Sequence, residues 1–315
     1  MTGHHHGSGA HGRSHATAHG TATRAHRRRL AVVLAITLVV MVGEVVGALA
    51  SGSLALLADA GHMLTDASGI ALALLAGWLA TRPPTTRRTF GWQRAEILAA
   101  LANALILGAV AVTVVVEGVG RAVDPDPGVD AGIMIAVAVV GLVANVVGLR
   151  ILAPGQGESL NVRGAYLEVL GDLLGSVAVV AAGVAVAGGF PRADGVASVA
   201  VGLMILPRAL LLLRDVVHVL LEATPAGVDL GQVRAHIEGV PGVVGVHDLH
   251  AWTITSGVPV LSAHVEVEPR LLERGDGTDV LRRLRTCLSG HFDVDHCTFQ
   301  IEPPDMRGTE TSAHR

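Results

Sequence analysis

The sequence predicts a membrane protein, with a six-helix transmembrane bundle followed by a small α+β domain. Half of the 315 residues are hydrophobic, only 16% are charged, and the mean hydropathy is +0.53. Soluble proteins carry about 25% charged residues, so this composition argues against a single water-soluble domain and against extended disorder. Six long apolar segments predict the helices of the bundle, and a change of composition after Glu222 marks the start of the second domain.

Each apolar segment is long enough to span a membrane, which takes roughly 20 largely apolar residues. Arginines gather before the first segment, between the second and third, and between the fourth and fifth, whereas the other links are acidic or short. This asymmetry predicts that both termini are cytoplasmic. The segments are residues 30–50, 54–80, 95–119, 130–152, 164–188 and 194–221.

The chain divides into four predicted regions. Residues 1–29 carry seven histidines and nothing that forms a core, so we expect a disordered His-rich tail. The tail either collects metal ions or is dispensable. Residues 30–222 form the transmembrane domain, residues 223–304 the cytoplasmic domain, and residues 305–315 a second disordered tail.

Hydrophobic periodicity within the cytoplasmic domain predicts an α-β-β-α-β order, which suits helices packed on one face of a sheet. The predicted elements are a helix at 229–237, strands at 243–254 and 258–267, a helix at 279–288 and a strand at 297–301.

Two pairs of ionisable residues lie well inside apolar segments, where such groups are costly and are functional candidates. His62 and Asp66 share one face of the second segment because they are four residues apart, and Glu168 and Asp172 do the same on the fifth. The two segments run in opposite directions. Placed side by side, they bring His62 level with Asp172, and Asp66 level with Glu168.

Three carboxylates repel one another strongly if no arginine lies at the same depth, as we expect here, and a divalent cation or protons relieve that repulsion. One imidazole with carboxylate oxygens suits four-coordinate Zn²⁺, has too little nitrogen for copper, and disfavours Mg²⁺ and Ca²⁺. A competing interpretation is that these groups only hold helices together. An intramembrane metalloprotease is a further alternative, but the sequence contains no His-Glu-x-x-His pair.

Other polar residues in the apolar segments have two interpretations each. Glu44, toward the outer end of the first segment, either helps an ion to leave or bonds a neighbouring helix. Asn145 in the fourth segment either supports the metal ligands or bonds another helix.

Four stretches resemble the cation diffusion facilitator family of divalent-metal transporters: SLALLADAGHMLTD at 53–66, FGWQRAEILAALAN at 90–103, GAYLEVLGDLLGS at 164–176 and HDLHAW at 247–252. The resemblance implies a homodimer, six helices per protomer and a ferredoxin-like cytoplasmic domain. It also implies export of Zn²⁺ or a related ion in exchange for protons. The family's transport site carries over to His62, Asp66, Glu168 and Asp172. Many members have His where this chain has Glu168, which resembles the cobalt–zinc–cadmium resistance branch.

Strand parity sorts the residues of the cytoplasmic domain. His264 shares a polar face with Glu302 and with His247 or His250, whereas Cys297 points toward the apolar side. The family resemblance indicates His247, His264 and Glu302 as ligands of a regulatory metal ion. The alternative is that these are solvated surface residues.

These observations predict a proton-coupled exporter of Zn²⁺, with Cd²⁺ and Co²⁺ as further ions, that works by alternating access in the plasma (inner) membrane. Zn²⁺ is the transported and regulatory ion, and H⁺ is the counter-ion. Besides lipid, the expected partner is a second copy of the chain. The net charge of −4 gives no reason to expect nucleic acid. The alternatives are a carrier of the same fold for Co²⁺, Fe²⁺ or Mn²⁺, and a membrane metal sensor without transport. We do not expect an enzyme.

Overall fold

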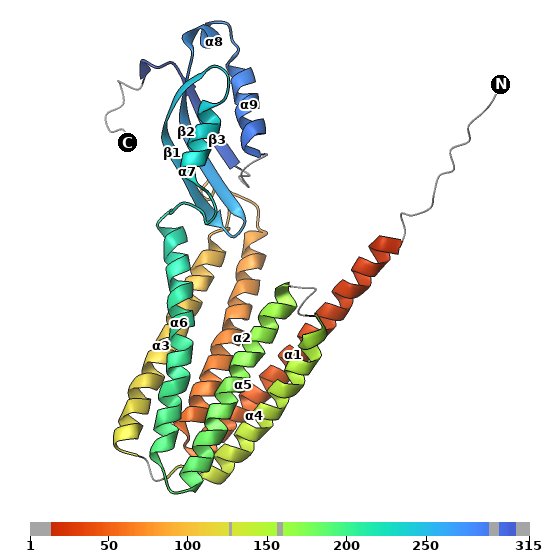
Figure 1. Cartoon of the computed structure of the whole chain (residues 1–315), viewed down its shortest axis with the longest axis vertical. Helices are drawn as coiled ribbons and strands as arrows, with labels where there is room; N and C mark the ends of the chain where they lie inside the picture. Colours follow the sequence, from red (N-terminus) through yellow and green to blue (C-terminus); the bar gives the residue numbers. More distant parts are fainter. Residues whose placement is uncertain (1–13, 126–127, 156–159, 290–295, 307–315) are drawn as a thin grey trace, which may run out of the picture. The chain divides into compact units, whose positions relative to one another are not determined.

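The computed structural model describes residues 14–125, 128–155, 160–289 and 296–306. Among these residues, six helices are long and apolar enough to cross a membrane, which confirms the predicted bundle. They are α1 (Ser14–Ser51), α2 (Leu54–Ala80), α3 (Ala95–Val123), α4 (Ala131–Leu152), α5 (Leu160–Ala187) and α6 (Arg192–Leu220) (Figure 1).

The helix α1 begins at Ser14, so the predicted disorder of residues 1–29 is wrong for the part from Ser14 onward. Once the apolar part of a helix has formed, each added residue gains one hydrogen bond at little cost, and Ala and Arg are strong helix formers. The helix therefore continues beyond the apolar segment toward the N-terminus. Residues 1–13 and 307–315 lie outside the described residues.

The chain forms two compact units, one from Met1–Ser68 with Ile106–Ala209 and one from Gly69–Leu105 with Leu210–Arg315. In the first unit, α4 packs against both α1 and α5 (Figure 1). Glycines make such packing close. A methyl group on Gly195 of α6 would lie 2.7 Å from the carbonyl oxygen of Gly118 in α3, and one on Gly47 of α1 would lie 2.6 Å from Val137 of α4. Small residues thus set the helix spacing, as expected in lipid.

A buried carboxylate fixes the N-terminus of α2. The side chain of Asp194, in the first turn of α6, accepts hydrogen bonds from Ser53 Oγ at 2.6 Å and from the backbone N–H groups of Leu54 at 3.0 Å and Ala55 at 3.1 Å. Arg121 of α3 pairs with the same carboxylate at 3.2 Å. Asp194 therefore satisfies N–H groups that a helix end leaves without partners, and it holds the helix that carries His62 in place.

The second unit contains a three-stranded sheet of order β1-β2-β3, in which β1 pairs antiparallel with β2, and β2 pairs parallel with β3. Its elements are α7 (Leu230–Glu238), β1 (Val243–Thr255), β2 (Val258–Val267), α8 (Pro269–Glu273), α9 (Gly277–Ser289) and β3 (His296–Glu302). A short 3₁₀ helix, η1 (Ala153–Gly155), belongs to the first unit.

The core of the cytoplasmic domain lies between this sheet and two helices (Figure 1). Val233 and Ile237 of α7, together with Leu284 of α9, pack against Leu261 and other apolar residues of β2. Asp229 caps α7 by accepting hydrogen bonds from the N–H groups of two residues in its first turn. The predicted α-β-β-α-β order with helices on one face is confirmed, and only the short α8 was not predicted. The opposite face of the sheet carries the paired His247 and His264 and, beside them, Glu266.

Candidate metal centre

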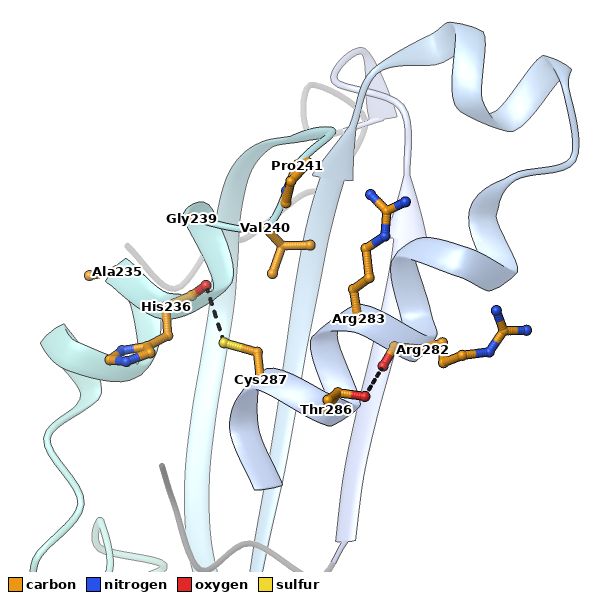
Figure 2. A pocket seen from close by; sticks show the side chains of 9 residues that line it. All are labelled: Ala235, His236, Gly239, Val240, Pro241, Arg282, Arg283, Thr286 and Cys287. Atoms are coloured by element: carbon orange, nitrogen blue, oxygen red, sulfur yellow. Dashed lines mark hydrogen bonds between the residues drawn. The ribbon is translucent and has the colours of Figure 1, made fainter. Parts of the chain in front are cut away.

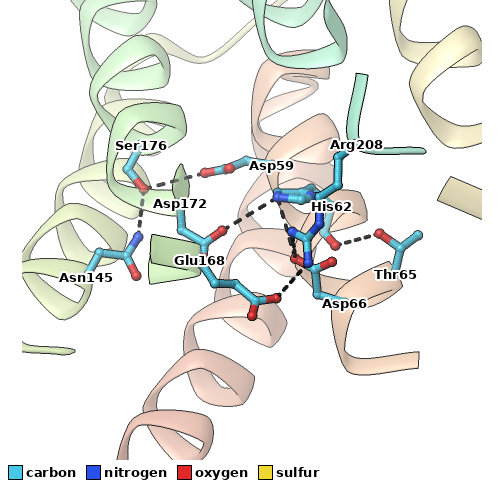
Figure 3. Close-up of polar contacts among 9 residues, drawn as sticks. All are labelled: Asp59, His62, Thr65, Asp66, Asn145, Glu168, Asp172, Ser176 and Arg208. Atoms are coloured by element: carbon cyan, nitrogen blue, oxygen red, sulfur yellow. Dashed lines mark hydrogen bonds and ion pairs between the residues drawn. The ribbon is translucent and has the colours of Figure 1, made fainter. Parts of the chain in front are cut away.

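An imidazole and two carboxylates converge inside the bundle. His62 Nε2 lies 3.5 Å from Asp66 Oδ2, one helical turn further along α2, and 3.8 Å from Asp172 Oδ1 on α5. The three residues each offer a ligand atom within 4.8 Å of the others (Figure 3). Asp172 is 4% exposed, and its Oδ1 accepts no hydrogen bond from any described residue. A buried carboxylate oxygen without a donor is suited to a cation.

The fourth predicted ligand, Glu168, lies outside this close group. Its Oε1 accepts a hydrogen bond at 3.2 Å from Arg208 of α6, and Arg208 also donates at 3.2 Å to Asp66 Oδ2 (Figure 3). The guanidinium thus bridges α2 and α5 on the Glu168 side of the cluster. The predicted heights of the four residues along α2 and α5 agree with the structure. His62 lies opposite Asp172, and Asp66 and Glu168 both pair with Arg208.

The expectation that no arginine lies at this depth is wrong. Arg208 comes from an otherwise apolar part of α6, directly after Pro207, and its flexible stem lets the charged group reach the carboxylates. Arg208 could have been found from the sequence. Any ionisable residue inside a membrane-spanning segment is a functional candidate, and this applies to an arginine as much as to the acidic residues.

A second polar chain adjoins the cluster, and of its three residues only Asn145 was singled out from the sequence. Asn145 of α4 donates to Ser176 Oγ at 3.2 Å, and the Ser176 hydroxyl donates to Asp59 Oδ2 at 3.5 Å (Figure 3). Asp59 is 2% exposed and lies three residues before His62, a spacing that places both on one side of α2. The hydrogen bond of Asn145 joins α4 to α5, as the helix-bonding interpretation of this residue predicts.

The cytoplasmic domain has its own cluster on the polar face of the sheet. His247 Nε2 hydrogen-bonds to Glu302 Oε1 at 2.7 Å, and His264 Nδ1 lies 3.7 Å from Glu302 Oε2. The two imidazole rings meet edge to face, with centroids 5.0 Å apart. These three residues form the second group of potential metal ligands within 4.8 Å of one another in the described part of the chain. Glu266 lies beside them, 3.8 Å from His247.

A β-bulge decides which histidine enters this cluster. His247 pairs with His264 and His250 pairs with Ser262, so two residues of β1 stand opposite one residue of β2. One of the two, Asp248, adopts a left-handed backbone conformation with φ of 47°. The bulge puts both histidines on the polar face, but His247 is buried whereas His250 is exposed.

The cysteines contact the apolar side of the domain, as predicted. Cys287 and Cys297 both pack against the core, and burial raises the pKa of the Cys297 thiol, which disfavours the thiolate form that binds metals. A cavity of about 700 Å³ opens between the end of α7 and α9, on the helical face of the sheet (Figure 2). Cys287 lines it and contacts the carbonyl oxygen of His236, while the His236 ring bonds within its own helix. Among the described residues, no acidic side chain lines this cavity.

Comparison with known proteins assigns the chain to a family. Residues 30–221 match the family model described as "Cation efflux transmembrane domain", and residues 225–304 match "Cation efflux protein, cytoplasmic domain". The chain belongs to the cation efflux family. The resemblance inferred from the four sequence stretches is thereby confirmed.

Several members of the cation efflux family are similar over most of their length. The metal cation efflux system protein CzcD of Cupriavidus metallidurans is 42% identical over 92% of this chain and 90% of its own. The zinc transporter ZitB of Escherichia coli is 41% identical over 96% of this chain and 95% of its own. The cadmium, cobalt and zinc/H⁺-K⁺ antiporter of Bacillus subtilis is 37% identical, over 83% and 84%.

Arg208 leads to a testable prediction about metal affinity. Its positive charge occupies oxygens that a metal ion would use, so replacing it should strengthen Zn²⁺ binding. For a half-exposed guanidinium, we expect Arg208→Gln to tighten Zn²⁺ binding about tenfold. Calorimetry on the detergent-solubilised protein measures this, with the exposed Arg150→Gln in α4 as the control. Weaker binding in Arg208→Gln would mean that the arginine supports the site.

Proposed function

We propose that this protein exports Zn²⁺, with Cd²⁺ and Co²⁺ as further substrates, from the cytoplasm in exchange for protons. The observation that carries the proposal is the group formed by His62, Asp66 and the buried Asp172, in which Asp172 Oδ1 accepts no hydrogen bond from any described residue. The names of the relatives support the substrate class, since they describe cation efflux, zinc transport and antiport with protons.

The donor set fits a borderline divalent cation. His62 supplies one nitrogen, while Asp66, Asp172 and Glu168 supply oxygens, and Zn²⁺ binds both atom types in four-coordinate sites. The predominance of oxygen makes the site less selective than one with two imidazoles, so that Cd²⁺ and Co²⁺ enter as well. Glu168 joins this set when its oxygen leaves Arg208, a change that a side-chain rotation accomplishes.

The negative charge of the empty site explains why protons are exchanged for the metal ion. Three carboxylates and one imidazole surround the ion, and after Zn²⁺ leaves only Arg208 remains beside two of the acids. The empty carrier must lose negative charge before it reorients within the membrane, and protons compete with metal for the same lone pairs. Metal leaving on one side is therefore followed by proton uptake on that side, and alternating access moves each ion in one direction.

The proposal extends to the membrane and the assembly. The arginine-rich links support a topology in which both termini are cytoplasmic, and the membrane of this proposal is the inner membrane of the cell. Two copies form the working unit, and the cytoplasmic cluster of His247, His264 and Glu302 binds a regulatory Zn²⁺. Two imidazoles and a carboxylate within 4.8 Å are three of the four ligands of a common zinc site, and Glu266 or water supplies the fourth.

Transport is tested in sealed vesicles with the protein inserted so that its cytoplasmic side faces out. An acidic lumen should accelerate Zn²⁺ uptake and an alkaline lumen should slow it, because lumenal protons replace the metal. Asp172→Ala should reduce uptake to the level of empty vesicles, since the carboxylates supply the ligand charge, whereas the exposed Asp124→Ala should transport normally. Uptake that ignores the pH gradient would indicate a facilitator. Binding without uptake would indicate a sensor.

The cytoplasmic site is tested separately in the full-length chain. A protein carrying Asp172→Ala should still bind about one Zn²⁺ per protomer, because the cytoplasmic ligands remain. Adding Glu302→Ala should abolish this binding, and adding His250→Ala, on the exposed part of the same face, should not. Equilibrium dialysis gives the stoichiometry. Equal zinc content in the Glu302 and His250 double variants would leave the cluster as a purely structural contact.

A further inference from the structure

We propose that Glu44 of α1 is a binding site for a transported proton, separate from the metal ligands. The inference rests on the proposed exchange of metal for protons and assigns one of those protons to a specific side chain. Glu44 belongs to neither group of potential metal ligands found among the described residues. No described hydrogen bond or ion pair joins it to His62, Asp66, Glu168 or Asp172.

Glu44 is a carboxyl group without a partner. It is 1% exposed, and neither Oε1 nor Oε2 has a hydrogen-bond partner among the described residues. Moving an unpaired carboxylate out of water costs several kcal/mol even after the protein relaxes, and a carboxyl group in such a place takes up a proton instead. The burial of Glu44 therefore indicates an uncharged carboxylic acid in this conformation.

The carboxyl group of Glu44 occupies the space beside a glycine of α4. A methyl group on Gly141 of α4 would lie 2.6 Å from Glu44 Oε1 and 3.6 Å from Ser176 Oγ, so any other residue would displace the carboxyl group. The same holds for Asp59, whose Oδ1 would lie 2.6 Å from a methyl group on Gly175 of α5. Glycines on two helices thus accommodate two buried carboxyl groups, and the Ser176 hydroxyl that donates to Asp59 also lies near Gly141.

The surrounding charges favour a proton over a metal ion. The charged groups that act on Glu44 are the carboxylates of Asp59 on α2 and Asp172 on α5, and both repel a negative charge there. From the neighbouring α4, Gly141 and the amide of Asn145 lie in this region, and neither carries a charge. Among the described residues no basic side chain pairs with Glu44. The oxygens of Glu44 and Asp59 also do not converge with a third ligand, as a metal ion would require.

The position of Glu44 suits a proton-binding site on the pathway between the metal ligands and the membrane surface. Glu44 lies about 10 Å along α1 from its end at Ser51, and Asp59 lies about 8 Å into α2 from Leu54, because a helix rises 1.5 Å per residue. His62 lies deeper, about 12 Å into α2. The two acids are thus level with each other, between the metal ligands and the turn that joins α1 to α2.

The proton balance follows directly. After Zn²⁺ leaves, Glu44 as a carboxylate takes a proton from water on the side reached through that turn. The neutral acid reorients with the empty carrier, and it returns the proton to water on the opposite side when Zn²⁺ binds. The Ser176 hydroxyl, which already donates to Asp59, provides a group through which protons pass between the neighbouring acids.

The test is the pH dependence of Zn²⁺ affinity in the full-length protein. All variants carry Glu302→Ala so that the cytoplasmic cluster does not contribute. Each proton displaced by the metal adds one unit to the slope of log affinity against pH. Glu44→Gln imitates the protonated acid permanently, so it should still bind Zn²⁺ but with a slope lower by about one. Glu44→Asp should restore the slope, and Glu117→Gln, an exposed acid in α3, should leave it unchanged.

A second variant covers the case in which Glu44→Gln fails to fold. Gly141→Ala keeps Glu44 but displaces its carboxyl group, so it should also lower the slope. A slope that is unchanged in Glu44→Gln, or in Gly141→Ala if only that variant folds, would overturn the assignment of Glu44. A wild-type slope of zero would instead overturn the proposed exchange of metal for protons, which separates the two failures.

Discussion

The free-energy cost of charged groups away from water is the constraint on which this structure depends. The acidic side chains inside the bundle differ in how they are neutralised. Asp194 is neutralised by Arg121 and by N–H groups of α2, whereas Asp66 and Glu168 share Arg208. Asp172 and Glu44 keep oxygens without donors. A fully paired acid is suited to holding helices together, and an unpaired one to exchanging ions.

This division explains why the helix that carries two of the candidate metal ligands is also anchored. Asp194 holds the first turn of α2 from α6, and eight residues later the same helix presents His62 to α5. The i,i+4 spacing then brings Asp66 to the side where Arg208 enters from α6. Since α6 contacts α2 both through Asp194 and through Arg208, a movement of α6 alters the helix position and the ligand charge together. Alternating access requires such coupling.

Much of this arrangement was predictable from the sequence. The six segments, the order of the cytoplasmic elements and the two i,i+4 pairs follow from hydropathy and helical spacing, which are local properties. Arg208 was missed because the partners of a long side chain depend on which helices are neighbours. The inclusion of His247 rather than His250 depends on a bulge at Asp248, and nothing in strand alternation signals an extra residue. The helical start of α1 reflects propagation from the apolar segment.

The most direct test of the account is an experimental structure of the full-length protein with Zn²⁺ bound. We expect an ion about 2.0–2.2 Å from His62 Nε2 and from oxygens of Asp66, Asp172 and Glu168. The guanidinium of Arg208 should be withdrawn from Asp66 and Glu168. We expect no metal density beside Glu44. An ion bound elsewhere in the bundle, while Arg208 still bridges Asp66 and Glu168, would contradict the proposal that Zn²⁺ displaces Arg208 from these two carboxylates.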